Sequence, residues 1–129
     1  MQFLVPVLVV GAGGALGSVL RYTLSLLAQR YSVTFPHGTL WANLLGCLII
    51  GIVVTSATAT ESISPSLRLF LATGICGGFT TMSSFIYELA QFAKDREFFY
   101  AGAYLSLTLF GCMAMFCIGG WLVQWTLKA

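Results

Sequence analysis

The chain has 129 residues, of which 58% are hydrophobic and only 8% are charged, and its formal net charge is +2. A soluble domain would carry about 25% charged residues, so the composition excludes that class and indicates a small integral membrane protein with a single domain, residues 1–129. The six lysines and arginines are scattered along the chain. The sequence therefore gives no indication of a nucleic-acid partner.

The first two uncharged runs predict two transmembrane helices. The first run begins at Met1, and its helix is expected to continue past Arg21 to about Ala28. This run has neither a basic start nor a small-residue cleavage site, so we expect a retained helix and not a signal peptide. A polar connector then ends at Pro36, and the second helix is expected over residues 37 to about 57.

A loop rich in serine and threonine, residues 56–66, leads to the second pair of helices. The third helix is expected from about Ser66 to Lys94, followed by a short charged turn at residues 94–97. The fourth covers much of residues 98–127, an uncharged run of 30 residues that must tilt or protrude from a bilayer. The sequence thus predicts an all-α membrane protein with four transmembrane helices.

The first helix also carries the spacing of a close helix–helix contact. Gly13 and Gly17 form a GxxxG pair. Similarly small surfaces on the second and fourth helices are offered by Gly46, Gly51, Gly111, Gly119 and Gly120. Such glycines let two backbones approach closely, but they are common in membrane helices generally. We interpret them as packing positions only.

The middle of the third helix has an unusual composition. Residues 74–88 read GICGGFTTMSSFIYE. Each of the three glycines costs about 1 kcal/mol relative to alanine in a helix interior, and the four hydroxyl groups that follow can bond to nearby backbone. The pattern predicts a helix that is broken at membrane depth, where freed carbonyls could hold a cation and freed N–H groups an anion. The alternative is an unbroken helix whose small residues pack against a neighbour.

Polar side chains recur at four-residue intervals on three of the helices. Each row lies on one helical face, so the three rows could converge into a polar track that binds an ion weakly enough to release it. Two alternatives stay open, because Thr39 and Thr108 could bond back to their own helices and Tyr104 could lie at the membrane interface. Asn43 is the strongest candidate, since a buried amide needs partners. The rows are Thr39 and Asn43, then Ser84 and Glu88, then Tyr104, Thr108 and Cys112.

Two ionisable residues and one aromatic residue are further candidates. Arg21 and Glu88 are expected near membrane depth, where ionisable groups are usually functional. Arg21 could instead extend to the membrane surface, and Glu88 could lie in water at a helix end. The ring edge of Phe85 is electropositive and could contact a small anion, with Met82 three residues earlier, but the residues by themselves favour a packing role for both.

The sequence resembles the Fluc-type fluoride channels in three segments: GGALGSVLRY in the first helix, GTLWANLLG in the second and GICGGFTTMSSFIYE in the third. The resemblance covers the entire chain. Members of that family form antiparallel, dual-topology homodimers with two pores and export fluoride passively. For this chain the resemblance implies a channel and not an enzyme, located in the bacterial inner membrane. Its implied partners are fluoride, the lipid bilayer and a second copy of itself.

The resemblance also implies roles for particular residues. Asn43 would contact the permeating ion, Phe85 would line the pore with rings from both subunits, and Arg21 would face a vestibule. The backbone carbonyls of Gly77 and Thr80 would hold a structural sodium ion at the dimer axis. The polar track would comprise Thr39, Ser84, Glu88, Tyr104 and Thr108.

Two positions in the expected pore depart from the family pattern. Met82 stands where the family normally has a second phenylalanine, and a thioether has no electropositive ring edge. Cys112 stands where a small hydroxyl residue is common.

Two other functions account for part of the sequence. A small dual-topology multidrug exporter would need a membrane-embedded carboxylate in its first helix, which here contains Arg21 and no acidic residue. A structural subunit of a membrane complex would require neither Asn43 nor an interrupted third helix. The passive fluoride channel accounts for more of these features than either alternative.

The basic residues of the loops predict the orientation of the chain in the membrane. One side carries two basic residues and the other carries three, which is almost no bias, and counting Arg21 changes this to two against four. A near-even count permits insertion in both orientations, which gives the hypothesis of an antiparallel dimer. The alternative is that an even count only reflects a short chain with few charges. The two sets are Arg68 and Lys128 on one side and Arg30, Lys94 and Arg96 on the other.

We therefore expect dual topology in cells. A single cysteine introduced within residues 56–66, in a variant without the four native cysteines, should react with a membrane-impermeant maleimide from both sides of the membrane. The measurement is the labelled fraction in right-side-out and inside-out vesicles. Labelling from one side alone would refute dual topology.

Overall fold

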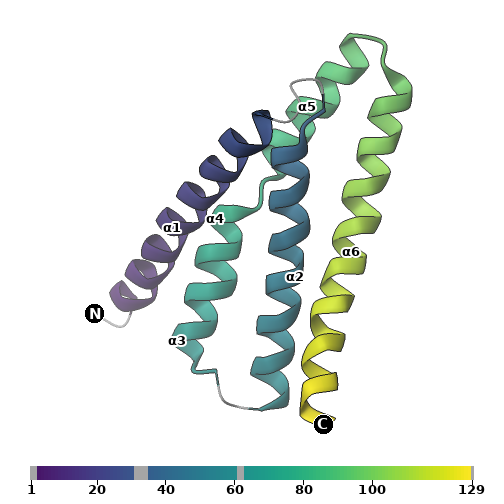
Figure 1. Ribbon diagram of the computed structural model, residues 1–129. Coiled ribbons are helices and arrows are strands. Elements are labelled where there is room, and N and C mark those ends of the chain that lie inside the picture. The colour runs from purple at the N-terminus through teal and green to yellow at the C-terminus, as the bar shows by residue number, and fades with distance from the viewer. Residues whose placement is uncertain (1–2, 31–34, 61–62, 129) are drawn as a thin grey trace.

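The computed structural model describes residues 3–30, 35–60 and 63–128. It has no strand within these ranges, and four of its helical segments are long and apolar enough to cross a membrane. This confirms the predicted all-α membrane architecture (Figure 1). Residues 31–34 of the predicted connector and residues 61–62 of the predicted loop, including Glu61, lie outside the described residues.

Three of the four segments are single continuous helices, and their ends lie within about one turn of those expected. Because the apolar run continues on both sides of Arg21, α1 does not stop there. Helix α2 follows directly after Pro36. Helix α6 is 31 residues long, whereas about 20 residues are enough to cross the hydrocarbon core. The three helices are α1 (Leu4–Gln29), α2 (His37–Ala59) and α6 (Phe98–Lys128).

The third segment is composed of several short elements. Its N-terminal part contains a π-helix, a wider helix that sequence patterns do not reveal. Thr80 and Thr81 then have extended backbone, with ψ angles of 155° and 116°, so the helical hydrogen-bond ladder stops between α4 and α5. The Thr81 hydroxyl caps α5 by accepting a hydrogen bond from Ser84 N at 3.2 Å. The elements are α3 (Pro65–Arg68), η1 (Leu69–Cys76), α4 (Gly77–Phe79) and α5 (Met82–Lys94).

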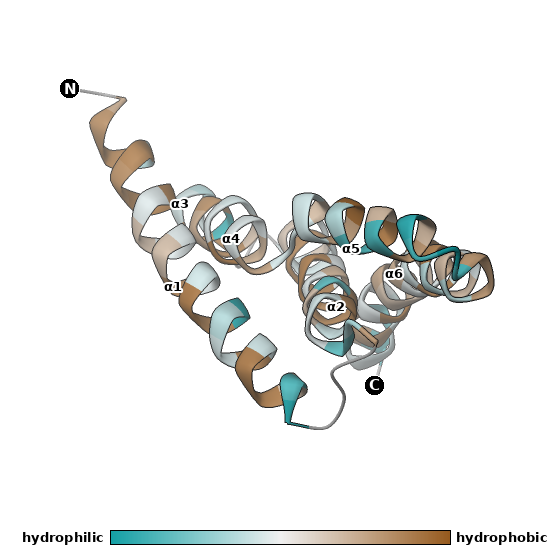
Figure 2. Ribbon diagram, turned by 90° about the horizontal axis from the view of Figure 1, so that it is seen from above, coloured by the Kyte–Doolittle hydropathy of each residue, from teal (hydrophilic) through white to brown (hydrophobic). Residues whose placement is uncertain are grey.

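The two parts of the third segment differ in the helix that they contact most. The η1 and α4 part contacts α1, the α5 part contacts α6, and α2 touches both parts. Viewed from above, α4 lies beside α1, whereas α5 lies over α2 and α6 (Figure 2). Helices α2 and α6 run side by side along their length (Figure 1). The extended residues therefore lie where the chain passes from one packing partner to the other.

Helix α1 approaches the third segment so closely that no side chain fits between them. A Cβ atom at Gly17 would collide with the carbonyl oxygen of Ile75 and would lie 2.8 Å from Phe79 N. One at Gly13 would lie 2.6 Å from Phe70 O. The GxxxG pair is thus a packing surface, as the sequence indicated.

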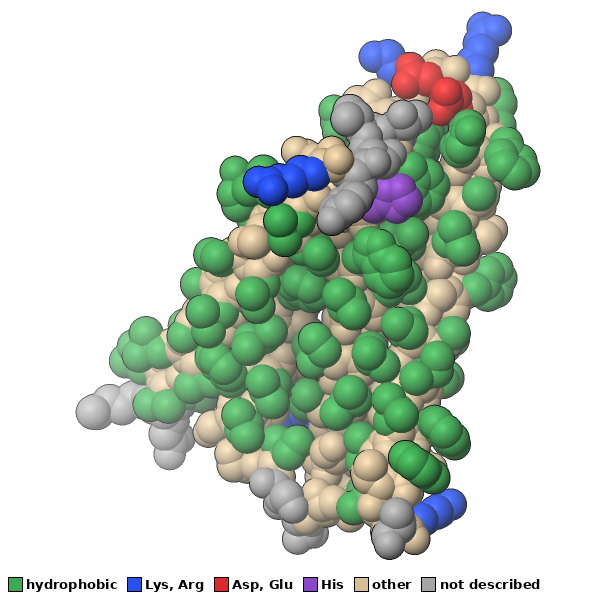
Figure 3. Space-filling view, viewed as in Figure 1, with side chains coloured by type: hydrophobic (Ala, Val, Ile, Leu, Met, Phe, Trp, Pro, Cys, Tyr) green, Lys and Arg blue, Asp and Glu red, His purple; other side chains and the backbone are tan. Residues whose placement is uncertain are grey.

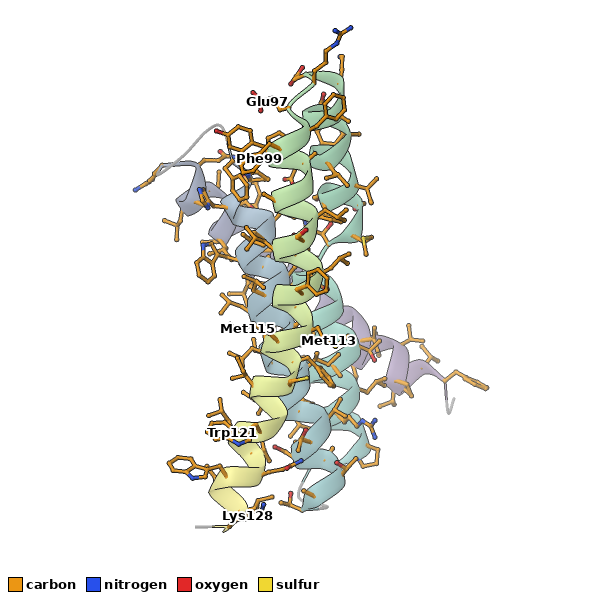
Figure 4. The ribbon with its side chains drawn as sticks, turned by 90° about the vertical axis from the view of Figure 1, so that its right-hand side faces the viewer. Glu97, Phe99, Met113, Met115, Trp121 and Lys128 are labelled. Carbon is orange, nitrogen blue, oxygen red and sulfur yellow. The ribbon has the colours of Figure 1, made fainter. Side chains whose placement is uncertain are left out.

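A cluster of buried apolar side chains lies at one end of the molecule, between α2, α5 and α6. It consists of Leu40, Phe85, Phe92 and Tyr104. Elsewhere large apolar side chains cover the surface, and the charged side chains visible in Figure 3 lie toward the two ends, with the acidic ones near the α5–α6 turn. Along α6, Phe99, Met113 and Trp121 project from the protomer (Figure 4). Such a surface requires lipid or another protein around it.

We expect Gly17→Ala to lower the free energy of unfolding by about 1–3 kcal/mol, because the added methyl group overpacks a backbone contact. Gly11→Ala is the matched control on the same helix, since its Cβ would meet no described atom within 4 Å. The control should be neutral or slightly stabilising, because alanine favours the helix. Thermal unfolding of both purified variants in detergent measures this, and equal stabilities would contradict the close contact.

Candidate functional site

A hollow of about 460 Å³ opens at the end of the molecule where α1 ends and α2 begins. Two residues of the predicted polar track, Thr39 and Glu88, line it. The charged residues Asp95 and Glu97 of the α5–α6 turn line it as well. The hollow therefore connects the outside with the buried polar residues described next.

The Glu88 carboxylate is the point at which the three predicted polar rows meet. Its Oε1 atom accepts a hydrogen bond from the Thr39 hydroxyl of α2 at 2.7 Å. Its Oε2 atom accepts one from the Tyr104 hydroxyl of α6, also at 2.7 Å. Tyr104 has 0% of its surface exposed and Thr39 has 6%. The alternative that Thr39 bonds back to its own helix is thus wrong, because its hydroxyl bonds across to α5. The alternative that Tyr104 lies at the membrane interface is also wrong, because Tyr104 is fully buried.

Asn43 holds the extended backbone of the third segment. Its Oδ1 atom accepts from Thr81 N at 2.8 Å, and its Nδ2 atom donates to Thr81 O at 3.2 Å. The side-chain amide thus replaces the hydrogen bonds that a continuous helix would have supplied. Within the described residues, the second N–H of this amide is donated to no acceptor. A buried residue, 8% exposed, therefore retains one unused donor.

Thr81 was not among the predicted site residues, although it connects several of them. Besides capping α5, its hydroxyl donates to Ser84 Oγ at 3.1 Å and lies 3.1 Å from Ser83 Oγ. Ser84 is thereby linked through Thr81 to Asn43. The available signal was a threonine three residues before a serine at a helix start, which is typical of an N-cap.

Thr108 and Cys112 continue the α6 row away from the hollow. Thr108 is 6% exposed, and its hydroxyl has no hydrogen-bond partner among the described residues. The alternative that it bonds back to its own helix is therefore wrong. Cys112 lies beside Cys47 of α2. The polar faces of α2 and α6 thus still lie against each other at these two cysteines.

Phe85 and Met82 face different surroundings, although they are one helical turn apart. Phe85 is 2% exposed, and its ring centroid lies 5.0 Å from that of Tyr104. Met82 is 66% exposed at the surface of the protomer. Within one protomer, the structure does not bring these two side chains to the same place.

Arg21 binds the backbone next to the extended residues. Its Nε atom donates to the carbonyl oxygen of Gly78 at 3.2 Å. In a continuous helix that oxygen would accept from Met82 N, which here lies beyond the extended residues. Arg21 does not line the 460 Å³ hollow. Its contact in the protomer is thus with a carbonyl that the third segment leaves without a helical partner.

The carbonyl of Gly77 is in a similar position. Its helical donor would be Thr81 N, which is directed to Asn43 instead. A Cβ at Gly77 would meet no atom of another helix within 4 Å. Thr80 N and the Thr80 hydroxyl both donate to Cys76 O at 2.9 Å. Among the described residues, no three His, Cys, Asp or Glu side chains form a metal-binding group.

Comparison with known proteins places these observations in a family. The family model described as CrcB-like protein, Camphor Resistance (CrcB), matches residues 8–120. A protein named fluoride-specific ion channel FluC from Prosthecochloris aestuarii is 43% identical over 113 residues, 88% of each chain. Proteins of the same name from Chlorobium chlorochromatii and Anaeromyxobacter dehalogenans are 44% and 43% identical over 119 residues, 92% of this chain and 92% and 94% of theirs. The chain belongs to the CrcB-like family.

Proposed function

We propose that this protein is a passive, electrogenic fluoride channel of the bacterial inner membrane, acting as an antiparallel homodimer with two pores. The observation that carries the proposal is Asn43, a buried amide with one undonated N–H beside extended backbone in a membrane segment. The name of the relatives, fluoride-specific ion channel, indicates the ion.

The buried donors suit an ion of this kind. Fluoride is small and strongly hydrated, so donors along a path must replace its water. Asn43 offers an N–H, and Thr108 offers a hydroxyl without a partner among the described residues. The electropositive ring edge of Phe85 could add a weaker contact. These neutral groups can replace hydration without binding the anion as strongly as a full positive charge would.

A passive pathway is sufficient for export. Hydrogen fluoride, the protonated form of the ion, crosses membranes unaided and dissociates inside, which traps the anion. An interior that is negative by 100 mV drives one negative charge outward by about 2.3 kcal/mol. The multidrug exporter is less well supported, because α1 contains no acidic residue for proton exchange.

The extended residues Thr80 and Thr81 support a functional break in the third helix. A backbone group left unpaired in hydrocarbon costs several kcal/mol, so irregular backbone persists there only with dedicated partners. Asn43 and Arg21 supply such partners. We interpret the break as the central part of the ion pathway.

The surface next to the break supports assembly with a second copy. Met82, Ile86 and Tyr87 are 66%, 52% and 65% exposed on α5. In an antiparallel dimer this face would meet its partner, and Met82 would reach a pore formed by both subunits. This arrangement would account for the separation of Met82 from Phe85 within one protomer.

A structural sodium ion would fit the same place. Carbonyl oxygens of unwound membrane helices are typical sodium ligands, and the helical donor of the Gly77 carbonyl, Thr81 N, is directed to Asn43 instead. The carbonyls of Gly77 and Thr80 would hold the ion. When bound, it would supply a positive charge that links the two protomers.

Vesicles that contain only this protein and are loaded with potassium fluoride should release fluoride when valinomycin is added, without a pH gradient. Asn43→Ala should lower the rate more than tenfold, because it removes a direct donor and leaves Thr81 N unpaired. Thr23→Ala is the control, since that exposed hydroxyl bonds only to its own helix at Val19 O. A fluoride electrode measures the flux. A fluoride flux that requires a pH gradient, or the absence of fluoride flux from vesicles that contain folded protein, would exclude a passive channel.

Met82→Phe should raise fluoride flux by less than tenfold, because it adds an aromatic ring edge worth about 1 kcal/mol. Met113→Phe is the matched control, since Met113 is equally exposed, at 66%, on the outer face of α6. Efflux rates are compared at equal protein density, with cross-linking to show that dimer formation is unchanged. If both variants behave like the wild type, Met82 has only a packing role.

A further inference from the structure

We propose that the Glu88 carboxylate is a tethered anion, which occupies a fluoride station between Thr39 and Tyr104 until the passing ion displaces it. The inference rests on the proposed function and assigns a specific step to one residue of the same site. Glu88 would act as a positioning residue, because it determines when the two hydroxyls can donate to the ion.

The geometry around the carboxylate is that of an occupied anion site. Each of its two oxygens accepts one hydroxyl hydrogen bond of 2.7 Å, from Thr39 on one side and Tyr104 on the other. A hydroxyl has a single hydrogen, so both donors are fully used. Fluoride needs the same hydrogens and carries the same charge. The ion and the carboxylate therefore cannot use these two hydroxyls at the same time.

Burial makes the competition direct. Tyr104 is 0% exposed and Thr39 is 6% exposed, so bulk water cannot easily supply replacement donors. An ion at this position would have to take the hydrogen bonds from Glu88. The carboxylate, which is half-buried, would then turn toward the hollow that it lines.

The position along the chain indicates the order of contacts. Glu88 and Thr39 line the 460 Å³ hollow, whereas Asn43 lies one turn further along α2 and does not line it. Tyr104 also packs on Phe85 at 5.0 Å between ring centroids. An ion that enters through the hollow thus meets the carboxylate before it reaches Asn43.

The function of such a competitor is to keep binding weak. A channel must bind its ion strongly enough to admit it and weakly enough to release it. Two buried hydroxyls with nothing else to bind would hold fluoride tightly. When the ion moves on, the two hydroxyls donate to Glu88 again. The hydrogen bonds lost to the ion are thus replaced, which lowers the free-energy cost of its release.

The test is the fluoride dependence of efflux for Glu88→Gln. The neutral amide can accept from only one of the hydroxyls, which frees the other for fluoride. The fluoride concentration at half-maximal flux should fall about tenfold, the effect of one hydrogen bond to a charged group, and the maximal flux should fall as well. Glu97→Gln is the control, because Glu97 carries the same charge at the hollow but binds neither hydroxyl. It should change the half-maximal concentration less than twofold.

A second comparison separates hydrogen bonding from charge. In a Thr39→Val, Tyr104→Phe background the donors are absent, so Glu88→Gln should no longer change the half-maximal concentration. An effect that persists there, or one that Glu97→Gln reproduces, would overturn the proposal in favour of simple charge repulsion. A wild-type protein that conducts no fluoride would contradict the proposed function instead, and the following measurement then decides the inference.

Infrared difference spectroscopy observes the carboxylate without conduction. The Glu88 carboxylate stretching band can be assigned by its loss in Glu88→Gln or its shift in Tyr104→Phe. Adding sodium fluoride to the detergent-solubilised wild type should shift this band, because the hydroxyls turn from the carboxylate to the ion, whereas sodium chloride should shift it much less. A band that fluoride leaves unchanged would overturn the proposal, whatever the flux.

Discussion

The pair of hydrogen bonds between Asn43 and Thr81 is the interaction on which the rest of the structure depends. Extended backbone inside a membrane segment exposes N–H and C=O groups that no lipid can satisfy. One side-chain amide satisfies both groups of Thr81, at 2.8 and 3.2 Å. The chain can therefore leave the helix at Thr80 and begin α5 anew at Met82. The same contact connects α2 to the start of α5.

The interruption allows one membrane segment to serve two packing partners. The α4 part lies against the glycines of α1, close enough for Arg21 to reach the Gly78 carbonyl at 3.2 Å. The α5 part instead packs on α6, where Phe85 contacts Tyr104. A straight helix would have followed one direction throughout. Because the chain changes direction at the extended residues, the side chain of Glu88 lies between Thr39 and Tyr104.

The resulting site combines satisfied polar groups with a few unused donors. The carboxylate of Glu88 and the backbone of Thr81, both half-buried, have their hydrogen bonds, which keeps these groups from destabilising the fold. The second N–H of Asn43 and the hydroxyl of Thr108 have none within the described chain. An anion pathway requires this combination, because structural donors must remain occupied while others stay available to the ion.

The sequence alone determined the four membrane spans, because the length of an apolar run decides whether it can cross a bilayer. It also determined which polar residues share a helical face, because the helix repeats about every four residues. Periodicity contains no information about how one helix is rotated and shifted against another. Only the tertiary structure therefore decided that Thr39 and Tyr104 meet at Glu88 and that Asn43 binds Thr81. For the same reason, only the packing of α1 and α5 placed Arg21 at a carbonyl and Met82 at the surface.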